Sequence, residues 1–341
     1  MTEPLSSMTV VQRVLSLSMH TPLSGTPARQ LLDSATRDTS ISIVERATGL
    51  PVTGLEPIVG RGMSADVIVA NTSEGRFVVR LKNADWLAHF RKEAWCLEQA
   101  HSGGVPVPRV IDYGVENTRA FSLARFVEGA HPIGTDCDRL RVWERLGHYA
   151  KILNQIPVRG FGSHMVAEGV FSLSTLQEML EPEINIVFRD AIWEQQGILS
   201  KAQTAALRRS LEDCYTIKGR SGVCQWDMCC ENALMRGANP DDVVLLDLDQ
   251  TVSVIVPAHQ LAYVAKAWGL DSAIMQAFLR GYGMSQGDFA EVLPLVKRLL
   301  VLQSMRSVRW AEDRSRNWLE KNLAKAHSDI VSYFGSELAP V

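Results

Sequence analysis

The chain has 341 residues, of which 46% are hydrophobic and 21% are charged, and its formal net charge is -3. This composition is typical of a folded globular protein and excludes intrinsic disorder, a collagen-like repeat and a disulfide scaffold. The length allows two domains, and the slightly acidic balance gives no basis for a nucleic-acid-binding surface, so we expect a protein that acts on small molecules.

No stretch approaches the roughly 18 uninterrupted apolar residues of a membrane-spanning helix, and the N-terminal run VVQRVLSLSM contains Arg13 and precedes no persuasive cleavage site. We therefore expect a cytoplasmic protein without a membrane partner. The cysteines lack the paired spacing of a zinc site, which favours reduced, partly buried thiols. They are Cys96, Cys137, Cys214, Cys224, Cys229 and Cys230.

The first part of the chain predicts an N-terminal extension (1–40) followed by a small lobe (41–127). A short helix precedes two alternating apolar runs on either side of NTSEG (71–75), which is typical of a β-hairpin. Apolar residues of LAHFRKEAWCLEQAH (87–101) then follow one helical stripe. Two more strand-like segments come next, GGVPVPRVIDYG and RAFSLARFVEG, so this lobe is predicted to be α+β.

The rest of the chain (128–341) predicts a larger, mainly helical lobe. In RLRVWERLGHYAKILNQI (139–156), apolar residues recur at helical spacing and define a stripe that faces the core. Ser200 and Gln203 indicate a capping box at the start of another helix. VVLLDLD (243–249) is the one strand expected among the helices. Further helical patterns cover 259–269, 273–283 and 289–334.

Three polar residues in this lobe have the order and spacing of a phosphoryl-transfer site. Asp227 and Asn232 are separated by four residues, as in a kinase catalytic loop, and Asp247 follows an apolar run where a second metal-binding acid is expected. Such a reaction needs metal ions and a cation for the phosphates and a carboxylate to orient the attacking hydroxyl. Alone, the Asp–Asn spacing is more typical of a loop with capping side chains.

The surrounding motifs resemble the aminoglycoside phosphotransferase and choline kinase superfamily. QWDMCCEN (225–232) and LDLD (246–249) are similar to its HGDLHPGN loop and its IDF/W-E strand end. The resemblance covers roughly residues 45–320 and includes GRGMSADVIVA, FVVRL and VPVPRVIDYG. It implies a two-lobed, protein-kinase-like α+β fold, with an antiparallel sheet and one main helix in a nucleotide-binding N-lobe and a larger, mostly helical C-lobe that binds the acceptor.

The resemblance also implies the roles of the loop residues. Asp227 would orient or deprotonate the acceptor hydroxyl, and Asn232 and Asp247 would bind Mg²⁺. Two positions depart from the family pattern, because Gln225 replaces the His that precedes the catalytic Asp and Gln260 replaces the Asp of a later segment, here IVPAHQLA. Two neutral side chains either keep a hydrogen bond that holds the loop or leave the loop looser.

In the small lobe, the resemblance places Arg80 where a phosphate-contacting Lys is usual, with Glu93 on the next helix as its partner. Lys82 is the alternative, because both cations lie on the same face of one strand. A loop over the phosphates would use glycine for close backbone approach. The loop residues are Gly60, Gly62 and Ser64.

These residues predict an ATP- or GTP-dependent O-phosphotransferase that modifies a small-molecule hydroxyl. The first acceptor considered is an aminoglycoside-like antibiotic, a nucleoside or another sugar-containing compound. Trp226 either fills space in the hydrophobic core or forms a wall of the acceptor pocket. The alternatives are a metabolic kinase for choline, homoserine or a sugar, and a degenerate module that binds a nucleotide without transfer. Four acids favour a cationic acceptor: Glu231, Asp249, Glu312 and Asp313.

Overall fold

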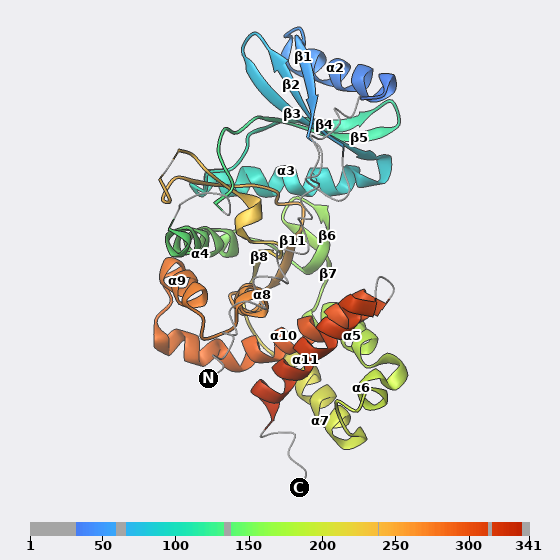
Figure 1. The fold of residues 1–341 in the computed structure, drawn as a ribbon, viewed down its shortest axis with the longest axis vertical. Coiled ribbons are helices and arrows are strands. Elements are labelled where there is room, and N and C mark those ends of the chain that lie inside the picture. Colours follow the sequence, from blue (N-terminus) through green and yellow to red (C-terminus); the bar gives the residue numbers. More distant parts are fainter. Residues whose placement is uncertain (1–31, 59–65, 133–137, 238, 313–315, 336–341) are drawn as a thin grey trace, which may run out of the picture. The chain divides into compact units, whose positions relative to one another are not determined.

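The computed structural model describes residues 32–58, 66–132, 138–237, 239–312 and 316–335 (Figure 1). The chain divides into two compact units. The first comprises residues 1–94 and 108–128, and the second comprises residues 95–107 and 129–341. No helix in the described part of the chain has the length and apolar character needed to cross a bilayer.

The first unit is built on a five-stranded antiparallel sheet with the strand order β1-β2-β3-β5-β4 (Figure 1). The predicted hairpin is confirmed, because β2 pairs with β3 along the whole length of β2 and Thr72 lies opposite Gly75 across the turn. The strands are β1 (Gly54–Pro57), β2 (Asp66–Thr72), β3 (Gly75–Asn83), β4 (Val110–Glu116) and β5 (Arg119–Arg125).

Helix α2 (Ser34–Thr48) covers one face of this sheet. Asp33 caps its N-terminus by accepting a 2.8 Å hydrogen bond from the Thr36 N–H, which satisfies one of the open backbone donors. Ile43 and Val44 pack on alternate residues of β2 and β3 in the apolar core. Residues 1–31 of the predicted extension lie outside the described residues. Helix α3 (Leu87–Ser102) follows β3, as predicted.

The second unit is mainly helical, as predicted, and contains α10 and α11 packed along each other (Figure 1). The apolar stripe of α4 is buried, and the predicted capping box of Ser200 and Gln203 is present at the start of α7. Its helices are α4 (Arg139–Gln155), α5 (Leu176–Val187), α6 (Ile192–Gln195), α7 (Lys201–Glu212), α8 (Ala258–Trp268), α9 (Ala273–Tyr282), α10 (Gln286–Glu312) and α11 (Arg316–Phe334).

The prediction of a single strand in this unit was wrong. The structure has a four-stranded sheet, β7-β6-β11-β8, and a two-stranded hairpin of β9 and β10. β11 is buried throughout and β8 almost throughout, so neither shows the polar and apolar alternation by which a strand is recognised. The strands are β6 (Phe161–Ala167), β7 (Val170–Leu173), β8 (Ser221–Gln225), β9 (Ala233–Met235), β10 (Val243–Leu245) and β11 (Thr251–Ile255).

Close backbone contacts fix α4 between α9 and β8. A Cβ atom on Gly147 of α4 would overlap the Phe278 carbonyl of α9, and one on Gly281 of α9 would overlap the Glu144 carbonyl of α4. On its other side, α4 reaches β8 through Asn154, whose side chain donates a 2.9 Å hydrogen bond to the Val223 carbonyl. Helix α4 therefore holds the strand that leads into the Asp227 loop.

We expect Gly281→Ala to lower the free energy of unfolding by roughly 1–3 kcal/mol or more, because the added methyl group must push two helix backbones apart. Gly287→Ala in α10 is the matched control, since its nearest neighbour would be the Ser285 Oγ at 3.7 Å. Urea unfolding followed by tryptophan fluorescence measures both. Equal midpoints for Gly281→Ala and wild type would contradict the close helix contact.

Candidate active site

The Asp227 loop leaves the end of β8 and returns to the chain through β9. Strand β8 pairs with β11 so that Gln225 lies opposite Thr251, and Asp227 comes two residues after this pair. Asn232 lies immediately before β9, and its carbonyl accepts a 2.7 Å hydrogen bond from the Leu246 N–H. Asp247 is the next residue, so the structure brings the three predicted residues to one end of the β9–β10 hairpin.

The side-chain amide of Asn232 holds Asp227. Its Nδ2 donates to the Asp227 backbone carbonyl and to the carboxylate Oδ2, both at 2.8 Å. Both N–H groups of the amide are thus engaged with one residue. The acceptor Oδ1 of Asn232 is left on the opposite side of the amide, where it can ligate a cation.

The surroundings make Asp227 a stronger base than an ordinary aspartate. Surrounding protein atoms desolvate its carboxyl and so raise its pKa, and the negative charges of Asp249 and Glu231 raise that pKa further. The hydrogen bonds from Asn232 and from the Cys229 thiol, whose Sγ lies 3.9 Å from Oδ1, act in the opposite direction. The carboxylate itself stays exposed to solvent, so an acceptor hydroxyl can reach it.

Asp247 occupies a left-handed backbone conformation, with φ of 52°. Asp adopts this conformation more readily than most residues that carry a Cβ, but it is uncommon and often marks a functional site. Neighbouring residues contact it: the Gln225 side-chain Nε2 donates to its backbone carbonyl, and the Asp249 N–H lies 3.4 Å from its Oδ1. The turn after β10 is therefore tied to the end of β8.

The two glutamines that depart from the family pattern are in contact. The Gln260 side chain of α8 accepts a hydrogen bond from the Gln225 N–H and donates one to the Gln225 carbonyl, each 3.2 Å long. Both side chains are fully buried. The two positions are therefore joined by neutral hydrogen bonds, which run from the Gln260 side chain to the Gln225 backbone.

A magnesium ion fits the donor atoms of this loop. Mg²⁺ prefers oxygen ligands, and the Asn232 Oδ1 and the Asp247 carboxylate are of this type. Within the described ranges, no group of three or more His, Cys, Asp or Glu side chains could hold a metal ion by itself.

Free thiols are found at Cys96, Cys214, Cys224, Cys229 and Cys230. Cys137 lies outside the described residues.

In the first unit, Arg80 of β3 and Glu93 of α3 form an ion pair with an N–O distance of 2.5 Å. Glu93 is only 3% exposed, so the ion pair offsets part of the cost of burying its charge. Lys82 instead places its Nζ 3.1 Å from the centre of the Trp86 ring. The predicted pair of Arg80 and Glu93 is therefore present, and the ammonium group of Lys82 lies against an aromatic ring. The predicted loop residues Gly60, Gly62 and Ser64 lie outside the described residues.

Beside the Asp227 loop, the structure places an arginine that sequence motifs did not indicate. The Arg306 guanidinium of α10 lies 5.7 Å from the centre of the Trp226 ring and pairs with Glu183 of α5 at 2.7 Å. Burial raises the pKa of the Glu183 carboxyl, and the charge of Arg306 counteracts this rise. Trp226 is only partly buried, so part of this aromatic residue next to Asp227 is accessible to solvent.

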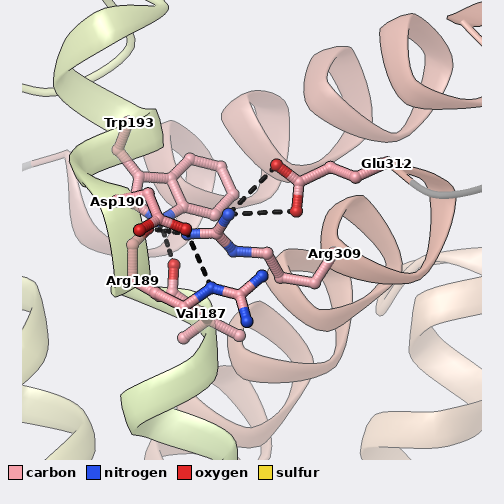
Figure 2. Close-up of polar contacts among 6 residues, drawn as sticks. All are labelled: Val187, Arg189, Asp190, Trp193, Arg309 and Glu312. Atoms are coloured by element: carbon pink, nitrogen blue, oxygen red, sulfur yellow. Dashed lines mark hydrogen bonds and ion pairs between the residues drawn. The ribbon is translucent and has the colours of Figure 1, made fainter.

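The acid Glu312, which the sequence suggested for a cationic acceptor, already has a partner. Figure 2 shows Arg309 of α10 between Glu312 and the chain segment that joins α5 to α6. Its Nη1 donates to both Glu312 carboxylate oxygens at 3.0 Å, and its Nη2 donates to the Arg189 carbonyl. Arg309 is 8% exposed, so Glu312 neutralises a buried cation. Asp313 lies outside the described residues.

The five-stranded sheet with its helix, the helical unit and the Asp227 loop define a phosphotransferase with a protein-kinase-like fold. The family model described as "Phosphotransferase enzyme family" matches residues 57–295. The chain belongs to this family. It is therefore an enzyme that transfers phosphate to an alcohol group of its acceptor.

The chain is similar to aminoglycoside 3'-phosphotransferase of Streptomyces fradiae, with 28% identity over 216 residues, which cover 58% of this chain and 73% of that protein. Solved structures of low identity share the fold. A ternary complex of the aminoglycoside phosphotransferase APH(4)-Ia with ADP and hygromycin B matches with a TM-score of 0.63 and 13% identity, over 86% of this chain and 98% of that one. A GDP and kanamycin complex of APH(2")-IIIa matches with a TM-score of 0.61 and 13% identity, over 87% and 99%.

Proposed function

We propose that this enzyme transfers the γ-phosphate of ATP or GTP to a hydroxyl group of an aminoglycoside-like antibiotic, with nucleosides and other sugar-containing compounds as related acceptors. The observation that carries the proposal is the Asp227 carboxylate, which the Asn232 amide holds by a hydrogen bond. Asp247 lies close by in the chain, because it follows Leu246, whose N–H bonds to the Asn232 carbonyl. The similarity to an aminoglycoside 3'-phosphotransferase supports the acceptor class. Such an activity would give resistance to the antibiotic, and it suits the cytoplasm, where nucleoside triphosphates are available.

In this mechanism, Asp227 accepts the hydrogen bond of the acceptor hydroxyl and aligns its oxygen for attack. The raised pKa of the carboxyl favours transfer of the hydroxyl proton to Asp227 as the new bond forms. Asn232 keeps the carboxylate in place. The Asn232 Oδ1 and the Asp247 carboxylate would hold Mg²⁺, which when bound neutralises charge on the phosphates.

We assign nucleotide binding to residues 41–127 and catalysis with acceptor binding to residues 128–341. Arg80 would contact the phosphates of the donor, with Glu93 setting the direction of its guanidinium. Gly60, Gly62 and Ser64 would cover the same phosphates. The two partners of the enzyme are then a nucleoside triphosphate and a small-molecule hydroxyl acceptor.

A metabolic small-molecule kinase is the second candidate, and a specific observation favours it. An aminoglycoside is a polycation that needs acidic partners, yet Glu312 is bound by Arg309 and Glu183 by Arg306. Arg306 also places a positive charge beside the Trp226 ring. An acceptor with fewer amino groups is compatible with this arrangement. A panel of aminoglycosides, nucleosides, sugars, choline and homoserine with labelled ATP and GTP distinguishes the two candidates.

We expect Asp227→Asn to lower transfer to the best acceptor about 10²–10⁴-fold while keeping the affinity for the Mg²⁺-nucleotide, because the change removes the base and retains the shape. Asp247→Asn should weaken Mg²⁺-dependent nucleotide binding as well, since it removes a charge from the metal ligands. Calorimetry measures the affinity, and mass spectrometry of the product measures transfer.

The matched control is Asp241→Asn, which changes an acid of the same hairpin that pairs with Arg141 and should leave both quantities unchanged. A wild-type protein that transfers nothing across the whole panel, with all variants equal to it in nucleotide affinity, would refute the phosphotransferase activity. A degenerate nucleotide-binding module would then be the correct description.

We expect Arg80→Ala to raise the nucleotide KM or lower kcat at least tenfold, because it removes a fixed, multidentate cation and breaks the ion pair with the buried Glu93. Arg76→Ala is the control on the same strand, since Arg76 pairs with the exposed Glu128. Steady-state kinetics at varied nucleotide concentration measure both variants. Loss of activity in Lys82→Ala with full activity in Arg80→Ala would show that Lys82 is the phosphate ligand.

A further inference from the structure

Among the residues that the structure describes, strand β8 lies at an edge of its sheet, and no strand pairs with its backbone on one side. The strand order β7-β6-β11-β8 gives β8 a single partner, β11. At Gln225, the N–H and the carbonyl both bond to the Gln260 side chain. In an antiparallel sheet these two groups of one residue point to the same side, so the Gln260 amide occupies the place of the missing strand.

An amide is well suited to this position. It carries a donor and an acceptor at once, as a peptide group does, and can satisfy both backbone groups of Gln225. Gln260 and Gln225 are fully buried, and an unsatisfied polar group there would cost roughly 1–3 kcal/mol. An ionised carboxylate at position 260 could accept from the N–H but would repel the carbonyl oxygen.

The contact continues beyond Gln225. Its own side chain donates to the backbone carbonyl of Asp247, which has the left-handed φ of 52°. Leu246, the residue before Asp247, bonds to the Asn232 carbonyl, and Asn232 holds Asp227. One series of hydrogen bonds therefore runs from α8 to the residues before and after the β9–β10 hairpin.

We propose that Gln260 and Gln225 are positioning residues, which form a neutral amide relay that sets the Asp227 loop and the Asp247 turn relative to each other. The proposal rests on the proposed function for the roles of Asp227 and Asp247. Neither glutamine touches a reacting atom. Because amides do not titrate, the relay keeps its geometry at every pH at which the protein is folded.

Gln260→Glu tests the relay, because a protonated carboxyl can replace both hydrogen bonds of the amide and an ionised one cannot. Burial raises the pKa of a carboxyl at this position above its usual range, so both forms are reached between about pH 5 and about pH 9. The titratable or charged groups of α8 are His259, Tyr263 and Lys266. Those of the elements packed against it are Cys224 of β8, Arg280 and Tyr282 of α9, and Asp288, Glu291, Lys297, Arg298, Arg306, Arg309 and Glu312 of α10. The neighbouring loop and turn add Asp227, Cys229, Cys230, Glu231, Asp247 and Asp249.

At low pH, we expect Gln260→Glu to have a kcat within about threefold of wild type at the same pH. As the pH rises, kcat should fall at least tenfold relative to wild type, in a step that wild type lacks, with little change in the acceptor KM. Gln260→Met has neither donor nor acceptor and should be impaired at every pH. Gln276→Glu, at an exposed position of α9, is the control and should follow wild type.

A second readout is independent of catalysis. Hydrogen exchange of the peptides that cover residues 221–235 and 243–250 should be at least tenfold faster in Gln260→Glu than in wild type at high pH, and equal at low pH. Identical exchange and identical pH profiles in Gln260→Glu and wild type would overturn the relay. If wild type transfers phosphate to no acceptor while the exchange changes as expected, the proposed function fails and the relay stands.

Discussion

Strand β8 is the constraint on which the site depends, because Asp227 follows directly from its end. Three elements fix it: β11 pairs with one edge, α4 packs on it through Gly222 and Asn154, and α8 closes the other edge with Gln260. Because α4 also packs closely against α9, the position of β8 depends on how these two helices pack. A loop that extends from such a fixed strand can hold a carboxylate in a defined place although the carboxylate itself is exposed.

Charge is distributed unevenly around this strand. Asp227, Glu231, Asp247 and Asp249 lie within a short stretch of loop and turn, and the charges of Asp249 and Glu231 raise the pKa of the Asp227 carboxyl. A further ionised group at position 260 would add to this repulsion, whereas the amide adds hydrogen bonds alone. In the first unit, the buried Glu93 forms an ion pair with Arg80. Buried ion pairs add little to stability in general, so a functional role is the better explanation for this one.

Much of the fold followed from local sequence signals. The β2–β3 hairpin, the stripe of α4 and the capping box of α7 each depend on residues close together in the chain, and each was predicted correctly. The strands β6, β7, β8, β9 and β11 were missed. β7, β8, β9 and β11 have five residues or fewer, and β11 is buried along its whole length and β8 along nearly all of it, so no alternation distinguishes these two from a piece of a buried helix.

The sequence by itself determined the family, the kinase-like fold and the order of Asp227, Asn232 and Asp247, because the spacing of a loop and a strand end is written in consecutive residues. The tertiary structure decided which residues support and surround them. The pairing of Gln260 with the Gln225 backbone and of Arg309 with Glu312 depends on which helix faces which strand or corner. Arg306 of α10 lies against the Trp226 ring although the two residues are 80 positions apart in the chain. Helix packing makes this contact, and no local sequence pattern predicts it.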